Sequence, residues 1–269
     1  MRQTMTSKWG FNTKAIHGGL NPDEKTGATT APIFQTAGFA HETAEDLENV
    51  FGGKRFGYLY SRISNPTVDA FEKRITALEN GLGSVGVASG MASISTTLFS
   101  LAAAGDHIIV STSIFGGTYY LIKGIVEDHD IQVTYVDPTD IEGIKESIKS
   151  NTRFVFVETI GNPKLDIPDI SSIHKLTQKA NIPLVVDSTV TTPYLFDPHK
   201  FGGDILLYAT TKYMSGSGTT VGGVIVDMGT FSWKKFNGKS VAKFSETLGG
   251  FAFIAMARKI RSNLGCNLS

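Results

Sequence analysis

The sequence contains a single cysteine, Cys266, among its 269 residues. One thiol excludes an internal disulfide and any zinc site built from several cysteines. No run of 18 or more apolar residues occurs, so no membrane-spanning helix is expected. The first 31 residues are polar and lack the apolar segment of a secretory signal, which favours a cytoplasmic protein.

An excess of charge of either sign is also absent, because 25 Lys and Arg residues balance 25 Asp and Glu residues. The chain therefore lacks the basic character of proteins that bind nucleic acids or acidic membranes, and neither partner is expected. Six histidines are scattered without a metal-binding spacing, so no metal site is expected. The apolar fraction of 41% is enough for a full core and excludes a disordered chain.

Residues 1–60 show few periodic patterns and many turn signals, including Gly18-Gly19, Asn21-Pro22 and Gly52-Gly53. We interpret them as an extended N-terminal arm that packs on another subunit. The alternative is a flexible N-terminus, against which Trp9, Phe11, Phe34 and Phe39 argue. Residues 61–269 are expected to form the main domain.

Short apolar runs alternate with helical patterns after residue 64. The predicted strands are 85–88, 107–110, 131–136, 154–157, 182–186, 205–207 and 224–226, and the predicted helices begin at Asn65-Pro66 and near Met91, then cover 116–128, 140–149, 170–180 and the region of 253–264. Continuously apolar strands between helices are typical of an α/β fold with a mostly parallel sheet and helices on both faces. Ligands of such sheets bind at the carboxyl ends of the strands.

The glycines Gly81, Gly83 and Gly86 have the spacing of the dinucleotide-binding fingerprint but not its structural context. That fingerprint must follow a strand and open a helix, whereas this one follows a predicted helix and enters a strand. We interpret it as a helix-to-strand turn, and a nucleotide-binding module is kept only as an alternative.

Three features near the ends of predicted strands are candidates for binding or catalysis. Ser89-Gly90-Met91 opens a helix, where free N–H groups and the helix dipole can bind an anion, although Ser89 also suits an ordinary N-cap. Asp187 ends an apolar strand, a costly position for a carboxylate without a cation. Lys212 follows the next strand among hydroxyls and a glycine-rich segment, a pattern that suits a Schiff-base lysine.

Taken together, these features resemble the pyridoxal-phosphate enzymes of cysteine and methionine metabolism, over essentially the whole chain. The resemblance rests on seven ordered motifs: Tyr60-Ser61-Arg62 with Asn65-Pro66-Thr67; Ser89-Gly90-Met91-Ala92; Phe115-Gly116-Gly117-Thr118-Tyr119; Glu158-Thr159 with Asn162-Pro163; Val186-Asp187 with Thr189; Thr192-Pro193-Tyr194; and Thr211-Lys212-Tyr213 with the glycine-rich tail. It implies the large domain of the aspartate-aminotransferase-like fold (fold type I), pyridoxal 5'-phosphate as the cofactor, and a cytoplasmic homotetramer.

The resemblance also implies a role for each matching residue. Lys212 would carry the cofactor and move protons at the substrate carbons, and Asp187 would hold a proton on the pyridine nitrogen. The remaining cofactor-binding candidates are Ser89, Gly90, Met91 and Thr211 at the phosphate, Phe115 stacked on the ring, Thr189, and Tyr60 with Arg62, which would reach the phosphate of a neighbouring subunit. Asn162 would help to hold the substrate carboxylate or the phenolic oxygen of the cofactor. Phe115 is also expected, with Lys212 and Asp187, among the catalytic residues.

The sequence departs from the family pattern at four places. Phe115 stands where a stacking tyrosine is usual, Ala209 where a serine is usual, and Ser188 where an asparagine is usual. The smaller C-terminal domain, which carries the arginine for the substrate carboxylate, is expected to be absent, because the chain stops at Ser269 after an amphipathic helix.

Within the family, the motifs favour γ-replacement on O-acetyl-L-homoserine by sulfide, which gives L-homocysteine and acetate for methionine biosynthesis. The alternatives are a cystathionine γ-synthase or γ-lyase activity, or a fragment that binds the cofactor without turnover.

Overall fold

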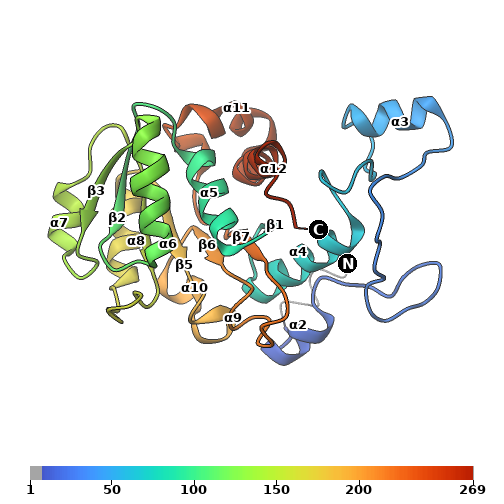
Figure 1. The fold of residues 1–269 in the computed structure, drawn as a ribbon, viewed down its shortest axis with the longest axis horizontal. Helices are drawn as coiled ribbons and strands as arrows, with labels where there is room; N and C mark the ends of the chain where they lie inside the picture. Colours follow the sequence, from blue (N-terminus) through green and yellow to red (C-terminus); the bar gives the residue numbers. More distant parts are fainter. Residues whose placement is uncertain (1–7, 269) are drawn as a thin grey trace.

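Residues 8–268, which the computed structural model describes, form a seven-stranded sheet flanked by helices (Figure 1). The strand order across the sheet is β1-β7-β6-β5-β4-β2-β3. The strands are β1 (Gly83–Val87), β2 (His107–Ser111), β3 (Gln132–Val136), β4 (Thr152–Glu158), β5 (Leu184–Asp187), β6 (Ile205–Tyr208) and β7 (Gly223–Asp227). Each coincides, within two residues at either end, with a strand that the sequence predicts.

The sheet is mostly parallel, as the sequence predicts. Strand β7 is antiparallel to both of its neighbours, β1 and β6. The other neighbouring pairs, β2-β3, β2-β4, β4-β5 and β5-β6, are parallel. The carboxyl ends of all strands except β7 therefore meet at one edge of the sheet, where α/β proteins bind ligands.

Two hydrophobic cores lie on opposite faces of the sheet, because side chains alternate along each strand. In β4, Phe154 and Phe156 point into one core, and Val155 and Val157 point into the other. The first core is covered by α5 (Gly90–Leu101), α6 (Gly116–Leu121), α11 (Lys239–Leu248) and α12 (Ala252–Leu264), and the second by α4 (Pro66–Glu79), α7 (Ile141–Glu146) and α8 (Ile170–Lys179). The short helices α9 (Thr192–Leu195) and α10 (Pro198–Phe201) follow β5.

Helix α4 begins where the sequence predicts. The Asn65 side chain accepts the N–H of Thr67 at 2.8 Å, and Pro66 occupies the first helical position, where its missing N–H is not needed. The helix ends at Asn80 in the left-handed conformation (φ 52°). Gly81 then leads into β1, so the glycine pattern of residues 81–86 is a helix-to-strand turn.

The predicted helix over residues 116–128 is divided into three parts. Helix α6 ends at Leu121, a π-helical turn covers Ile122–Val126, and a 3-10 turn covers Glu127–His129. Gly116, Gly117 and Gly124 weaken regular α-helical geometry in this segment. The prediction of a single continuous helix over residues 116–128 is therefore wrong.

The N-terminal region contains two helices that the sequence analysis did not predict, α2 (Phe11–His17) and α3 (Ala44–Phe51). Helix α3 has a normal N-cap, because the Thr43 hydroxyl accepts the N–H of Asp46. Figure 1 shows α3 and its flanking segments projecting away from the sheet. The division into an arm of residues 1–60 and a main domain stays a prediction.

Helix α12 is tied to the rest of the domain by a buried ionic cluster. Arg261, which is 2% exposed, donates to Glu72 of α4 and to the carbonyl of Gly86 in β1. The segment after α12 also contacts β1, where the Ala88 N–H donates to the Cys266 carbonyl at 2.9 Å. Among residues 8–268, every helix is too short or too polar to span a lipid bilayer.

Candidate functional site

The structure brings several of the predicted site residues to the carboxyl edge of the sheet. Asp187 is the last residue of β5, and Lys212 lies on the turn that follows the neighbouring strand β6. Ser89 and Gly90 follow the end of β1. A methyl group placed on Gly90 would lie 2.4 Å from the Cβ atom of Ala209, so the backbone beside the lysine turn packs directly on the start of α5.

Asp187 is a partly buried carboxylate without a cation. Its Oδ1 atom accepts the N–H of Thr189 at 2.9 Å. Burial raises the pKa of Asp187, and the hydrogen bonds from Thr189 oppose that change. No ion pair within the described part of the chain involves this carboxylate. Such a group is best stabilised by a positively charged ligand.

Lys212 is exposed, and within residues 8–268 its amine has no hydrogen bond or ion pair. The turn that carries it is fixed on both sides. The Thr211 hydroxyl donates to the Gly222 carbonyl at 3.2 Å and accepts the Gly222 N–H at 3.0 Å. The Thr189 hydroxyl accepts the Ala209 N–H at 2.8 Å. Thr211 and Thr189 thus anchor the lysine turn, and the amine of Lys212 stays free to react.

The start of α5 offers unpaired N–H groups. The Ser89 hydroxyl accepts the Ala92 N–H at 3.1 Å and caps the helix. The preceding N–H groups, those of Gly90 and Met91, have no acceptor inside the helix because they lie in its first turn. Together with the helix dipole they form a position for an anion.

Phe115 and Asn162 lie on two loops that meet at a second carboxyl group, that of Glu158. The Phe115 ring is 47% exposed, whereas its N–H donates to Glu158 Oε1 at 2.7 Å. The Asn162 N–H also donates to the Glu158 carboxylate. Burial and the charge of Asp187 raise the pKa of Glu158 to about 8. Glu158 is absent from the site residues inferred from the sequence, although it ends an apolar strand just as Asp187 does.

Tyr60 and Arg62 lie on the segment before α4. Arg62 donates to the Ser262 carbonyl at 2.9 Å, and its guanidinium carbon lies 5.5 Å from the centre of the Tyr60 ring. Both side chains are exposed. Within residues 8–268, no hydrogen bond or ion pair joins either side chain to Lys212.

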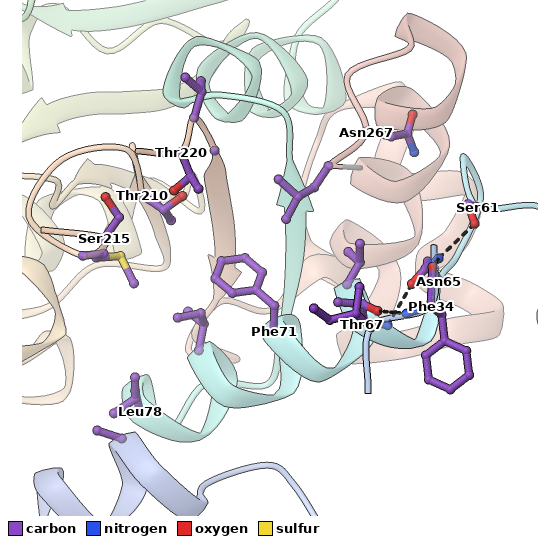
Figure 2. A pocket seen from close by; sticks show the side chains of 18 of the residues that line it. Phe34, Ser61, Asn65, Thr67, Phe71, Leu78, Thr210, Ser215, Thr220 and Asn267 are labelled. Atoms are coloured by element: carbon purple, nitrogen blue, oxygen red, sulfur yellow. Dashed lines mark hydrogen bonds between the residues drawn. The ribbon is translucent and has the colours of Figure 1, made fainter. Parts of the chain in front are cut away.

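A pocket of about 1530 Å³ separates the N-terminal region from the lysine turn. Figure 2 shows Ser61, Asn65 and Thr67 on one side, Thr210, Ser215 and Thr220 on the other, and Phe71 between them. Arg62 and Tyr213 also line the pocket, whereas Lys212 lies outside its lining. Residues 8–268 contain no cluster of three or more His, Cys, Asp or Glu side chains that could hold a metal ion.

The chain is similar to known proteins of one family. The family described as "Cys/Met metabolism PLP-dependent enzyme" matches residues 12–261. The O-acetyl-L-homoserine sulfhydrylase of Leptospira meyeri is 35% identical, over 99% of this chain and 60% of its own length. An L-methionine gamma-lyase of Fusobacterium nucleatum is 38% identical, over 82% of this chain and 56% of its own. The chain thus spans little more than half the length of these curated relatives.

Solved structures share the fold. A Campylobacter jejuni protein described as an O-acetylhomoserine (thiol)-lyase, which carries a pyridoxyl-lysine monophosphate, superposes with a TM-score of 0.87 at 30% identity, over 97% of this chain and 67% of its own. The cystathionine gamma-lyase of Lactobacillus plantarum, complexed with L-serine, gives a TM-score of 0.81 at 32% identity, over 97% of this chain and 60% of its own.

Proposed function

Because the chain belongs to the family of Cys/Met metabolism PLP-dependent enzymes, we propose that it binds pyridoxal 5'-phosphate at Lys212. The proposed reaction is γ-replacement on O-acetyl-L-homoserine. The bond between the γ-carbon and the acetate oxygen breaks, a bond between the γ-carbon and sulfide forms, and L-homocysteine and acetate leave. The observation that carries the proposal is the meeting of Lys212, Asp187 and the start of α5 at one edge of the sheet.

The residues present fit this cofactor. Asp187 is a partly buried carboxylate that lacks a cation, and a protonated pyridine nitrogen would supply one. The free amine of Lys212 suits covalent attachment of an aldehyde. The first turn of α5 presents unpaired N–H groups to a phosphate. Bound pyridoxal phosphate supplies an electron sink for negative charge on the substrate carbons.

Each of these side chains has a distinct role in the proposed reaction. Lys212 attaches the cofactor and then removes protons from the α- and β-carbons of the substrate. Asp187 keeps the ring nitrogen protonated by the charge of its carboxylate. The Phe115 ring stacks on the cofactor and excludes water from one face, although it lacks the phenol of a tyrosine.

The phosphate is held by the N–H groups of Gly90 and Met91, with Ser89 and Thr211 close by. The Thr211 hydroxyl already donates to the Gly222 carbonyl and accepts the Gly222 N–H, so it can donate to a phosphate oxygen only if its proton turns away from that carbonyl. Asn162 and Thr189 lie beside the pyridine ring of the cofactor in this proposal.

The proposed assembly is a dimer of dimers. In it, Tyr60 and Arg62 bind the phosphate at the site of the neighbouring subunit, where the arginine fork pairs with the phosphate charge. Their exposure in the single chain supports this arrangement.

The first experiment records the visible absorption of the purified chain after addition of pyridoxal phosphate. We expect a yellow band that borohydride fixes to the protein, and its loss in Lys212→Ala. Lys179→Ala, which removes an exposed lysine at the end of α8, is the control and should keep the band. A well-folded wild-type chain without a band, or a band that survives in Lys212→Ala, would overturn the proposal.

The second experiment separates the reactions within the family. O-acetyl-L-homoserine with sulfide should give homocysteine, and Lys212→Ala should lower its formation by about 10²–10⁴-fold or more. If O-acetyl-L-homoserine reacts with cysteine but not with sulfide, the chain is a cystathionine γ-synthase. Release of methanethiol from methionine would indicate a γ-lyase, the activity named for the relative from Fusobacterium nucleatum. Cofactor binding without any product would indicate a chain that binds the cofactor but does not turn over.

A further inference from the structure

Glu158 is a buried carboxyl group that the proposed reaction does not use. It is the last residue of β4 and is paired in register with Asp187, the last residue of β5. The side chain is largely buried, since the whole residue is 6% exposed. A carboxyl group is rarely buried unless it is hydrogen-bonded, so its partners indicate its role.

Those partners are the backbones of two loops that carry site residues. Glu158 Oε1 accepts the N–H of Phe115 at 2.7 Å, in the loop after β2. The same carboxyl group accepts the N–H of Asn162, in the loop after β4. One side chain at the end of a strand is therefore hydrogen-bonded to both loops.

The two loops also touch each other beside Glu158. A methyl group placed on Gly161 would lie 2.1 Å from the Ser113 hydroxyl oxygen and 2.9 Å from the Ser113 carbonyl oxygen. Such a close approach is possible only because Gly161 lacks a side chain. The Phe115 loop and the Asn162 loop are thus packed as one unit, and Glu158 is the buried group that binds both.

We propose that Glu158 is a positioning residue, which holds the Phe115 loop and the Asn162 loop in the arrangement that receives the cofactor. The proposal rests on the proposed function for the identity of the ligand. Glu158 meets both loops through backbone N–H donors, so hydrogen-bond acceptance is the property that matters. Glutamine is the neutral isostere that keeps an accepting oxygen.

The experiment compares three variants of the full chain. Glu158→Gln keeps an accepting oxygen on a side chain of the same length. Glu158→Asp keeps the carboxyl group on a side chain one methylene shorter, and Glu158→Leu removes the hydrogen-bond acceptor. Asp227→Leu is the matched control. Asp227 is also a buried carboxyl that accepts a backbone N–H, that of Gly229 at 2.8 Å, but it lies at the opposite edge of the sheet.

Two measurements are made on each variant. The first is the dissociation constant of pyridoxal phosphate, together with the circular dichroism of its visible band, which reports the orientation of the ring. The second is amide hydrogen exchange of residues 112–118 and 159–166 in the cofactor-free protein. We expect Glu158→Leu and Glu158→Asp to weaken cofactor binding about tenfold or more and to speed exchange in both loops, because buried N–H groups lose their acceptor.

Glu158→Gln should stay within about threefold of the wild type in cofactor affinity and should keep the dichroism band. Asp227→Leu should lose global stability without weakening cofactor binding. The proposal is overturned if Glu158→Asp binds the cofactor as tightly as the wild type. It is also overturned if Asp227→Leu weakens cofactor binding as much as Glu158→Leu does. If the wild type forms no Lys212-dependent band, the proposed function fails, and unchanged loop exchange in the Glu158→Asp variant would separately overturn the positioning role.

Discussion

At the scale of single residues, buried carboxyl groups make the stability of the fold depend on pH. Glu79 is 3% exposed and accepts a hydrogen bond from the Tyr208 hydroxyl. Burial raises the pKa of Glu79 to about 7, the hydrogen bond from Tyr208 opposes the shift, and the charge of Asp197 adds to it. The folded chain therefore binds a proton that the unfolded chain has already released between about pH 4 and pH 7.

The free energy of unfolding should consequently fall as the pH rises from 5 to 8. The contribution of Glu79 is fully present below its unfolded pKa and is lost as the pH passes its folded pKa. The side chain of the Glu79→Gln variant cannot titrate. We therefore expect the free energy of unfolding of this variant, measured by urea titration, to decrease between pH 5 and pH 8 by about 3 kcal/mol less than that of the wild type. Glu142→Gln, on a side chain that is 70% exposed, is the control. A pH slope that is unchanged in Glu79→Gln would contradict the prediction.

At the scale of elements, the attachment of α12 depends on one buried ionic cluster. Glu72 of α4 accepts hydrogen bonds from Arg258 and Arg261 of α12 and from the Gly86 N–H of β1. Removal of Glu72 would leave Arg261, which is 2% exposed, without a counter-charge. Loss of one partner from a buried pair usually costs about 3–5 kcal/mol.

We therefore expect Glu72→Met to lower the free energy of unfolding by about 3–5 kcal/mol in a denaturant titration. The control is Glu142→Met, which breaks the exposed pair with Lys145 and should cost less than about 1 kcal/mol. Equal losses in the two variants would show that the cluster contributes no more than a surface ion pair.

The same cluster shows how far the sequence alone can lead. The strands and the starts of α4 and α5 are predictable, because apolar runs and capping residues such as Asn65 and Ser89 act on their immediate neighbours. The bond between Arg261 and Glu72 joins residues 189 positions apart, and no local pattern signals it. The same holds for Glu158 and the Phe115 N–H, 43 positions apart. Asp187 and Lys212 are recognisable because Asp187 ends an apolar strand and Lys212 lies on the turn after the next one.

At the scale of the whole molecule, two arrangements differ in which chain supplies Arg62 to a given site. Arg62 lines the pocket that the lysine turn of the same chain also lines. Its guanidinium nevertheless donates to the Ser262 carbonyl at 2.9 Å and stays exposed. One arrangement places Arg62 at the phosphate of its own chain, and the proposed arrangement places it at that of a neighbour.

Mixing two variants that are each impaired in cofactor binding distinguishes these arrangements. Arg62→Ala should weaken cofactor binding about 10–100-fold, because a hydrogen-bonded charge at the phosphate is lost. Arg55→Ala, on an exposed arginine of the same region, should not weaken it. If the site is shared, a dimer of one Arg62→Ala chain and one Lys212→Ala chain contains one intact site, so co-refolded mixtures should regain tight, borohydride-fixed binding that neither variant shows alone. If Arg62 serves its own chain, every site in the mixture lacks either Arg62 or Lys212, and no tight binding returns.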